Sequence, residues 1–414
     1  MPKTCSPCVT ELGAAQIVEA IADAAGRWRE ADFPARVRAT RAVMERSGYT
    51  EPVVAYALDR LFGAITKTAL CATIVGELGS LEALDGFVAR PGRPDARYAG
   101  LELVTIVSSD TTIGVAIPPL VFAACAKSNV VVKDRSDDLV AAFVETLAAE
   151  RPELGAAISV ERWQGHDDPR AAERLASSDA VVVFGGPAAL RAIRKRCRAD
   201  ARFVAFGHRT SVGYIARESL NDAGARRACA AAAARDVLLY DGEGCLSLHV
   251  LFLERGGPSE PSTYSRSLID ALDAEALSFP SASEQPAPAT AAVRDAARFR
   301  QAQGIGDLYP GFTGPHLLVF DQPRELPPPL SPRTLAVYEV DGPADALAFV
   351  RRHALPLEAF ALCGADRPDV LAAAVASGAT RIARLGTLQA PVLTGEHGGV
   401  GRILPFVRAI SKDR

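Results

Sequence analysis

Between about residues 101 and 206, short β-rich runs alternate with helical stretches, and this alternation constrains the fold more than any other feature of the chain. The β-rich runs are LELVTIV, NVVVK, AAISVERW, DAVVVF and RFVAF. Strands that alternate with helices predict a doubly wound α/β domain with a mainly parallel sheet. Such a sheet binds its ligand at the carboxyl ends of its strands, so functional residues are expected there.

The length of the chain and its later patterns predict a second domain. A chain of 414 residues exceeds what one hydrophobic core usually serves. An alanine-rich helix at about 221–236 leads into the strand LSLHVLFLE, and strand–helix alternation resumes in TLAVYEV and AFALCG. Apolar residues at helical spacing predict a helical N-terminal region. We therefore expect a helical region at 1–90, one α/β domain at 91–215, a second at 216–395 and a C-terminal tail at 396–414.

Composition and charge exclude several classes of protein. Apolar residues make up 49% of the chain, charged residues 23%, and the net charge is −3, so neither a nucleic-acid partner nor an acidic substrate is implied. The longest apolar stretch, residues 113–126, contains two prolines and is shorter than the roughly 20 residues of a membrane-spanning helix. The N-terminal residues lack the apolar run of a secretory signal. We therefore expect a cytoplasmic protein without a membrane span.

The cysteines and histidines do not follow the spacing of metal or disulfide frameworks. Eight cysteines are spread without a repeating interval, and most lie among apolar residues. Cys5 and Cys8 form a C-x-x-C pair, but no second pair exists and no strand–helix unit carries this one. The six histidines never occur as a pair at a helical metal spacing. The sequence therefore predicts no metal site.

Cys245 is the strongest candidate for a nucleophile. Gly242 and Gly244 bracket Glu243 directly before it, between a long helix and a buried strand. A thiolate that attacks a carbonyl needs open approach on one face, and the resulting oxyanion needs nearby backbone N–H groups, which a glycine-rich backbone provides. A buried structural cysteine beside an ordinary glycine turn is the alternative interpretation of the segment.

Two further features lie at predicted strand ends in the first α/β domain. Gly185 and Gly186 follow an apolar strand at 179–184 and precede a helix with Pro187 at its first position. A helix N-terminus with glycines before it can bind a phosphate, although the G-x-G-x-x-G fingerprint is absent and a tight turn remains the alternative. Lys133 closes the strand NVVVK, where a cation can hold a ribose or its phosphate, or can simply be solvated.

Several segments together resemble one family. They are SSDAVVVFGGPAALRAIRKR, RFVAFGHRTSVGYI, RDVLLYDGEGCLSLHV, SPRTLAVYEV and TGEHGG, of which GEGCLS is the most specific. The chain is similar over nearly its whole length to the fatty acyl-CoA reductases of LuxC type in the aldehyde dehydrogenase superfamily. The resemblance implies two doubly wound α/β domains with the active site in the cleft between them. It makes 91–215 a Rossmann-like dinucleotide-binding domain, on which 1–90 packs, and 216–395 the catalytic domain.

The resemblance also implies a reaction and its residues. The reaction is NAD(P)H-dependent reduction of a fatty acyl thioester, carried by CoA or by a protein, to the aldehyde. Cys245 corresponds to the acyl-accepting cysteine, Lys133 to the lysine on the adenosine ribose, and Gly185-Gly186 to the turn near the cofactor phosphates. A homo-oligomer is expected from the superfamily, and an acyl-protein synthetase or transferase is a candidate partner.

The stretch 204–208 favours reduction over oxidation. In aldehyde-oxidising relatives the matching run carries a glutamate that activates water to hydrolyse the acyl-enzyme, and here it has no carboxylate. Water attack would destroy the intermediate that a reductase needs, so the absence fits thioester reduction. His208, in the same stretch, is a candidate to protonate the product oxygen, and a structural turn histidine is the alternative.

The chain departs from the family pattern at two positions. Asp110 stands where the family has an asparagine that donates to the oxyanion, which an ionised aspartate cannot do. Leu248 replaces a proline beside His249, for which a core histidine is the favoured interpretation. These departures motivate a rival hypothesis, a degenerate dehydrogenase fold that serves as a binding or scaffold subunit of an acyl-transfer complex. A semialdehyde dehydrogenase acting on an acyl phosphate is a further alternative.

The residues after Lys133 predict the choice of cofactor. NAD-selective relatives carry a glutamate at the position of Ser136, where it repels the 2′-phosphate of NADP. Arg135 can pair with that phosphate bidentately. Asp137 and Asp138 weaken this interpretation, although at the start of a helix they can simply favour its N-terminus. We predict a preference for NADPH, with NADH as the alternative.

Overall fold

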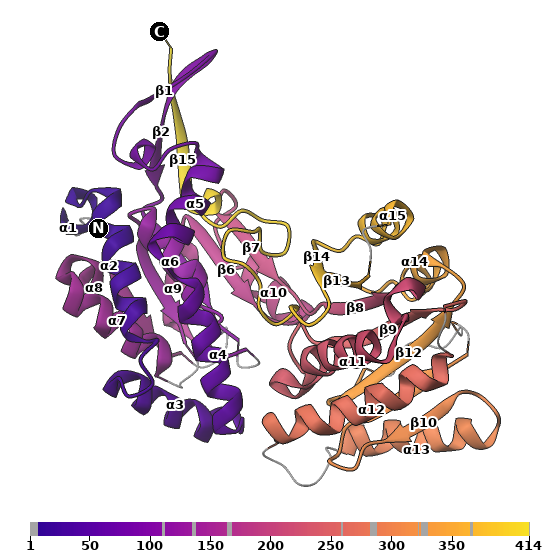
Figure 1. The fold of residues 1–414 in the computed structure, drawn as a ribbon. Coiled ribbons are helices and arrows are strands. Elements are labelled where there is room, and N and C mark those ends of the chain that lie inside the picture. Colours follow the sequence, from indigo (N-terminus) through magenta and orange to yellow (C-terminus); the bar gives the residue numbers. More distant parts are fainter. Residues whose placement is uncertain are drawn as a thin grey trace. The chain divides into compact units, whose positions relative to one another are not determined.

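In the computed structural model of the protein, the described residues are 7–109, 112–134, 138–163, 168–257, 260–281, 288–321, 323, 330–364 and 367–413. The chain groups into two compact units (Figure 1). The first unit comprises Met1–Gly207 with Val392–Arg414, and the second comprises His208–Pro391.

Helices at the N-terminus cover part of the first unit. They are α1 (Pro7–Glu11), α2 (Ala14–Arg27), α3 (Pro34–Ser47), α4 (Glu51–Ala64) and α5 (Lys67–Leu78), followed by the short η1 (Glu82–Leu84). Trp28, which follows α2 and is fully buried, stacks on Phe62 of α4 with ring centroids 4.7 Å apart. Its Nε1 donates a hydrogen bond of 3.0 Å to Oγ1 of Thr146 in α7 (Leu139–Glu150). The buried indole thus joins these helices to the helices beside the sheet, and its N–H is satisfied.

A five-stranded parallel sheet forms the centre of the first unit. In spatial order its strands are β5 (Ile158–Glu161), β4 (Asn129–Lys133), β3 (Leu103–Val107), β6 (Ala180–Phe184) and β7 (Arg202–Phe206). The connecting helices are α6 (Ile117–Cys125), α7 (Leu139–Glu150), α8 (Pro152–Ala157), α9 (Pro169–Ser177) and α10 (Pro187–Arg194). The central strands are almost entirely apolar because helices cover both faces of a doubly wound sheet. The strand order reverses direction between β3 and β6, which is where such sheets bind ligands.

The second unit contains a seven-stranded sheet. In spatial order its strands are β10 (Asp307–Pro310), β11 (His316–Phe320), β12 (Thr334–Val340), β9 (Leu248–Glu254), β8 (Thr210–Ile215), β13 (Leu357–Cys363) and β14 (Arg381–Arg384). Among the described strands of this sheet, only β10 runs antiparallel to its neighbour. The helices of this unit are η2 (Arg217–Leu220), α11 (Ala223–Leu238), η3 (Leu239–Gly242), α12 (Pro261–Ser278), α13 (Pro288–Ala302), α14 (Pro343–Arg352) and α15 (Pro368–Ala376).

A small antiparallel sheet joins segments from both ends of the first unit. Its strands are β1 (Val88–Arg90), β2 (Arg93–Gly100) and β15 (Val407–Lys412), in that order, and the short η4 (Leu404–Phe406) precedes β15. The hairpin and β15 project together from the rest of this unit (Figure 1). The carboxylate of Glu77 in α5 accepts hydrogen bonds from three successive backbone N–H groups, those of Arg402, Ile403 and Leu404. These contacts fix the C-terminal segment against the N-terminal helices.

Two observed boundaries differ from those expected from the sequence. The expected end of the first α/β domain was residue 215, but β8 lies in the second sheet, where it pairs with both β9 and β13. Residues from 392 onward pack with the first unit and end in a paired strand, whereas a tail was expected from 396. Both differences arise from pairing between segments far apart in sequence, which strand periodicity does not report.

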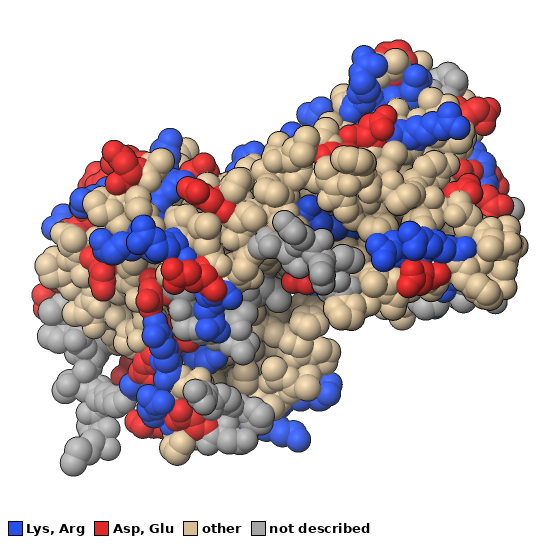
Figure 2. All heavy atoms as spheres, turned by 90° about the horizontal axis from the view of Figure 1, so that it is seen from below, with Lys and Arg blue, Asp and Glu red and all other residues tan. Residues whose placement is uncertain are grey.

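The surface carries both signs of charge. On the face shown in Figure 2, Lys and Arg side chains are interspersed with Asp and Glu, in keeping with the net charge of −3. In the described part of the chain, no single helix is long and apolar enough to cross a membrane. Helices α4 and α5 meet that test only when taken together, and they are bent by 58° at the break between them.

Candidate active site

The turn that carries Cys245 has an unusual backbone. Tyr240, Asp241 and Gly242 are three consecutive residues with left-handed φ angles of 57°, 54° and 76°. For an L-residue other than glycine this conformation costs roughly 1–2 kcal/mol. Such outliers persist only where surrounding structure holds them, and they concentrate at functional sites. The turn then continues through Gly244 and Cys245 into β9.

Arg333, directly before β12, holds the first part of this turn. Its backbone N–H donates to the carbonyl of Asp241 over 3.0 Å, and its Nε donates to the Asp241 carboxylate over 2.6 Å. Its Nη2 donates to the carbonyl of Phe279 over 2.6 Å, and the residue is only 8% exposed. A Cβ on Gly242 would lie 3.2 Å from both the Arg333 nitrogen and the Val237 oxygen, so this position favours glycine by space as well as by φ.

Two further anchors hold the second part of the turn. Ser211 of β8 donates its hydroxyl to the carbonyl of Cys245 over 2.9 Å. Gln389 donates its Nε2 to the hydroxyl of Ser247, also over 2.9 Å, and the Ser247 N–H closes a hydrogen bond to Gly244. The segment that bears Gln389 is itself fixed by α11, because the buried carboxylate of Asp236 accepts from two of its backbone N–H groups, at residues 386 and 388. Three elements distant in sequence therefore position the cysteine.

The thiol of Cys245 is partly exposed and protonated at neutral pH. Burial raises the pKa of the thiol to about 11, and the charge of Glu358 on β13 adds to this rise. The backbone N–H groups of Cys245 and Leu246 and the charge of Arg209 act in the opposite direction. Arg209 also pairs with Glu358, with 3.6 Å between its Nη1 and Oε2 of the carboxylate. The thiolate is the nucleophile, so these surroundings control its availability.

The two histidines near this turn have different settings. His208 is exposed and lies three positions before Ser211, and within the described residues no hydrogen bond links it to Cys245. His249 of β9 is partly exposed, and burial lowers the pKa of its ring to about 4. His249 is therefore neutral at pH 7, as a histidine of the sheet interior would be. His208 remains a candidate on its position alone.

Lys133 and the glycine pair lie on one edge of the five-stranded sheet. Val107, the last residue of β3, pairs with Lys133 on one side and with Val183 on the other. Because these strands are parallel, Lys133 and Gly185 lie at the carboxyl edge on either side of β3. Gly186 is the N-cap residue of α10 and offers no side chain to the first turn. A helix N-terminus and an ammonium group at the reversal of strand order fit the phosphates and ribose of a dinucleotide.

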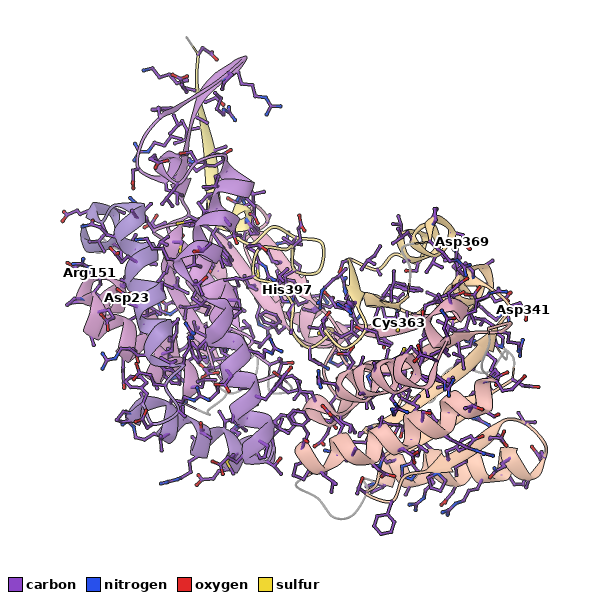
Figure 3. All side chains as sticks on the ribbon, viewed as in Figure 1. Asp23, Arg151, Asp341, Cys363, Asp369 and His397 are labelled. Carbon is purple, nitrogen blue, oxygen red and sulfur yellow. The ribbon has the colours of Figure 1, made fainter. Side chains whose placement is uncertain are left out.

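An aromatic stack extends this edge. Phe184 and Phe206 end β6 and β7, and their ring centroids are 4.9 Å apart. The ring of His397 stacks on Phe206 with centroids 4.0 Å apart and planes 17° from parallel (Figure 3). The glycine-rich segment TGEHGG, which contains His397, thus packs at the carboxyl ends of β6 and β7. The sequence singled out this segment without indicating where it lies.

Some predicted residues lie outside the described part of the chain. They are Asp110, Arg135, Ser136 and Cys5, and for Cys8 only the backbone is described. Among the described residues, no group of three or more His, Cys, Asp or Glu side chains could hold a metal ion.

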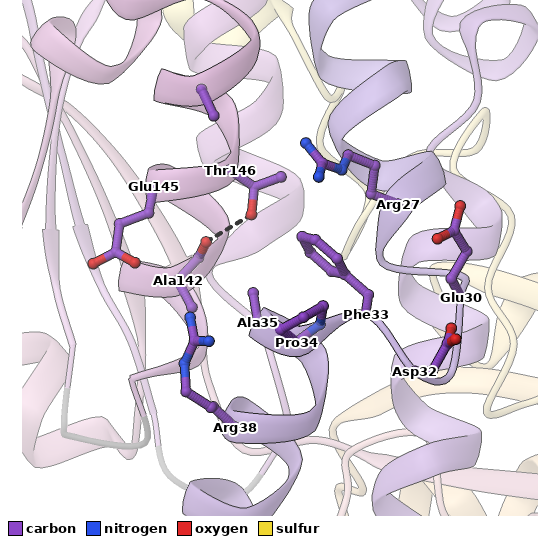
Figure 4. Close-up of a pocket in the computed structure, with 11 residues that line it drawn as sticks. Arg27, Glu30, Asp32, Phe33, Pro34, Ala35, Arg38, Ala142, Glu145 and Thr146 are labelled. Carbon is purple, nitrogen blue, oxygen red and sulfur yellow. Dashed lines mark hydrogen bonds between the residues drawn. The ribbon is translucent and has the colours of Figure 1, made fainter.

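A hollow of about 490 Å³ lies elsewhere in the first unit, between α3 and α7 (Figure 4). Its charged lining includes Arg27, which pairs with Glu150 over 3.2 Å and lies 4.9 Å from the ring centroid of Phe33. Thr146 at its wall donates to the carbonyl of Ala142. The hollow contains none of the residues that the sequence predicted.

Comparison with protein-family models decides the family. The model for acyl-CoA reductases of LuxC type matches residues 9–409. The chain belongs to the LuxC acyl-CoA reductase family. A search of curated protein sequences found no significant match.

Solved structures support the fold of this LuxC-family protein. A NAD-dependent benzaldehyde dehydrogenase from Corynebacterium glutamicum matches 98% of this chain and 87% of its own, at 13% identity and a TM-score of 0.70. An NADP-dependent glyceraldehyde-3-phosphate dehydrogenase from Bacillus halodurans C-125 matches 97% and 88%, at 13% identity and a TM-score of 0.67. A NAD-dependent aldehyde dehydrogenase from Sinorhizobium meliloti matches 99% and 84%, at 13% identity and a TM-score of 0.69.

The predicted family and the aldehyde-dehydrogenase-like α/β fold are therefore confirmed. The LuxC-family protein is an acyl-CoA reductase, an oxidoreductase that reduces a fatty acyl group to the aldehyde. Neither the scaffold subunit nor the semialdehyde dehydrogenase acting on an acyl phosphate is favoured by these findings.

Proposed function

We propose that Cys245 carries the acyl group as a thioester during NADPH-dependent reduction of a fatty acyl-CoA or acyl-protein to the aldehyde. The supporting observation is the turn that bears this cysteine. Two non-glycine residues before the cysteine have left-handed conformation, and hydrogen bonds from Arg333, Ser211 and Gln389 hold the turn. A fold does not require such a costly turn at an ordinary buried cysteine.

The acyl-transfer step follows from the groups around the sulfur. The Cys245 thiolate bonds to the acyl carbon, the bond from that carbon to the sulfur of the carrier breaks, and the carrier leaves as its thiol. The backbone N–H groups of Cys245 and Leu246, which stabilise the thiolate, are also suited to donate to the developing oxyanion. This source of donors does not depend on Asp110.

The nicotinamide cofactor supplies the hydride that reduces the acyl group. Lys133 holds the cofactor at the carboxyl edge of the five-stranded sheet, together with the N–H groups of the first turn of α10, which follow Gly185 and Gly186. Arg135 selects the 2′-phosphate of NADPH. His208 donates a proton to the oxygen of the resulting thiohemiacetal on Cys245 and takes it back as the bond between the carbon and the Cys245 sulfur breaks. The aldehyde then leaves and Cys245 returns to the thiolate.

Each unit has one part in this proposal. The α/β domain of the first unit binds the dinucleotide, and the second unit carries the nucleophile. An acyl-protein synthetase or transferase supplies the activated acyl group, and the protein acts as a homo-oligomer.

A labelling experiment tests the nucleophile. The full-length protein is incubated with radiolabelled fatty acyl-CoA in the absence of cofactor and then denatured. We expect label on the wild type, no label on Cys245→Ala, and wild-type labelling of the matched control Cys197→Ala, since Cys197 is a partly exposed cysteine of the first unit. Label retained by Cys245→Ala would contradict the assignment.

A further inference from the structure

Two cysteines that the proposed reaction does not use lie in contact in the second unit. Cys229 is on α11 and is 3% exposed, whereas Cys363 is the last residue of β13 and is partly exposed (Figure 3). Both are free thiols, and their Sγ atoms are 2.7 Å apart although 134 positions separate them in sequence.

The backbone on both sides fixes this contact. The Cys363 carbonyl accepts hydrogen bonds from the N–H of Ala216 over 3.1 Å and from the hydroxyl of Ser219 over 2.8 Å. Cys229 lies within a regular helix, and the hydroxyl of the fully buried Tyr264 is 4.0 Å from its sulfur. The fold therefore fixes the backbone positions of both cysteines and so keeps their sulfur atoms in contact.

We propose that Cys229 and Cys363 form a redox-active pair that a hydroperoxide converts to a reversible disulfide. The Cys363 thiolate attacks the terminal peroxide oxygen and the O–O bond breaks, which gives a sulfenic acid and an alkoxide or hydroxide. This leaving group takes a proton from solvent and departs as an alcohol or water. The sulfur of Cys229 then attacks the sulfenic sulfur, the S–S bond forms, and water leaves with the thiol proton. The two thiols lose two electrons in total, and the peroxide gains them.

The surroundings direct the first attack to Cys363. The hydrogen bond from the Cys229 thiol lowers the pKa of Cys363, and the same contact with burial raises the pKa of Cys229. Burial also raises the pKa of Cys245 to about 11. Since thiolate character and access set the rate of peroxide attack, Cys363 reacts before Cys245, and Cys229 resolves the product.

A disulfide between Cys229 and Cys363 would close a loop of the chain that contains Cys245. The span from Cys229 to Cys363 contains the turn of Cys245 and the strands β9 to β12. A disulfide across it ties the helix that leads into this turn to the end of β13 and restricts the unfolded chain.

Peptide mapping tests the pair directly. The reduced full-length protein is treated with one equivalent of hydrogen peroxide, blocked with iodoacetamide and digested without reduction. We expect a peptide that links Cys229 to Cys363 and is lost on reduction, while Cys245 is recovered alkylated. The link should persist in the matched control Cys71→Ser, whose cysteine lies in the first unit. Recovery of both Cys229 and Cys363 as alkylated peptides, or of either one linked elsewhere, would overturn the proposal.

A stability measurement supplies a second readout without activity. In a Cys245→Ala background, oxidation should raise the thermal midpoint by several degrees. The same treatment should leave the midpoint of a variant that also carries Cys229→Ala unchanged. Should that variant fold poorly, Cys363→Ala serves in its place, because Cys363 is partly exposed. An equal rise with and without the pair would refute the cross-link.

Discussion

Replacing Asp241 by asparagine isolates the ion pair that holds the turn before Cys245. Asparagine adopts the left-handed conformation as readily as aspartate, so the backbone preference is unchanged. The substitution removes the charge that faces Arg333, whose side chain is 9% exposed, while that of Asp241 is 23% exposed. The variant therefore tests the ion pair and not the turn sequence.

The expected loss follows from the burial of the two partners. Leaving one charge of a buried pair without its partner costs about 3–5 kcal/mol, and the partial exposure of Asp241 places this pair near the lower end, about 3 kcal/mol. Left-handed conformation at Tyr240 and Asp241 costs roughly 1–2 kcal/mol each, so the lost interaction is comparable with the strain it restrains. The turn should then relax in part of the population. Since about 1.4 kcal/mol corresponds to a tenfold change, kcat/KM should fall by up to about 100-fold.

Three measurements on Asp241→Asn separate this explanation from general damage. We expect lower kcat/KM for acyl-CoA-dependent oxidation of NADPH, slower alkylation of Cys245 and unchanged cofactor binding. Asp200→Asn is the matched control, because the ion pair of Asp200 with Arg198 is exposed. This substitution should leave kcat/KM, Cys245 alkylation and cofactor binding unchanged. Wild-type kcat/KM and a wild-type rate of Cys245 alkylation in Asp241→Asn would refute the reasoning, as would an equal loss of cofactor binding.

Three further predictions concern pH and cofactor choice. In the cofactor-free protein, the rate of Cys245 alkylation should rise about tenfold per pH unit through pH 9, since the thiol has a pKa of about 11, and a plateau near pH 7 would contradict this. Glu358→Gln should speed the alkylation at fixed pH, because it removes a charge that raises this pKa, and an unchanged rate would contradict that role. Burial raises the pKa of Asp236 to about 7, so the folded form binds a proton that the unfolded form releases near pH 4. Its contribution to stability is complete below about pH 4 and is lost as the pH rises to about 7, so the pH slope of the unfolding free energy should flatten in Asp236→Asn, and an identical slope would count against it. The ratio of kcat/KM for NADPH to that for NADH should exceed one in the wild type and fall in Arg135→Ala; a wild-type preference for NADH would reverse the cofactor prediction.

The five strands of the first α/β domain could be predicted because their signals are local. The run LELVTIV contains β3 (Leu103–Val107), and NVVVK coincides with β4 (Asn129–Lys133). The sheet of β1, β2 and β15 could not be predicted, because Gly100 pairs with Val407 and no local period marks so distant a partner. The same reason explains why the expected boundary at residue 215 grouped β8 with the first α/β domain.

The candidate site likewise contains residues that could be predicted from the sequence and residues that could not. Cys245 could be found because its glycines adjoin it in sequence, whereas Ser211, Arg333 and Gln389 reach its turn only through the folded chain. Glu358 could have been identified from the sequence, because it is a charged residue within the apolar strand LEAFALC. A charge in such a place is unusual and points to a local electrostatic role.

The first unit is interrupted in sequence by the whole second unit, and this sets an order for its assembly during translation. The ribosome must deliver all of His208–Pro391 before β15 can reach β2 and before residues 402–404 can meet Glu77. Until then β2 keeps an open edge, which can pair with other chains. A newly made chain can therefore complete the seven-stranded sheet that follows the Cys245 turn while its first unit still lacks β15. Aggregation of nascent chains should then begin at the open edge of β2 and not at the seven-stranded sheet.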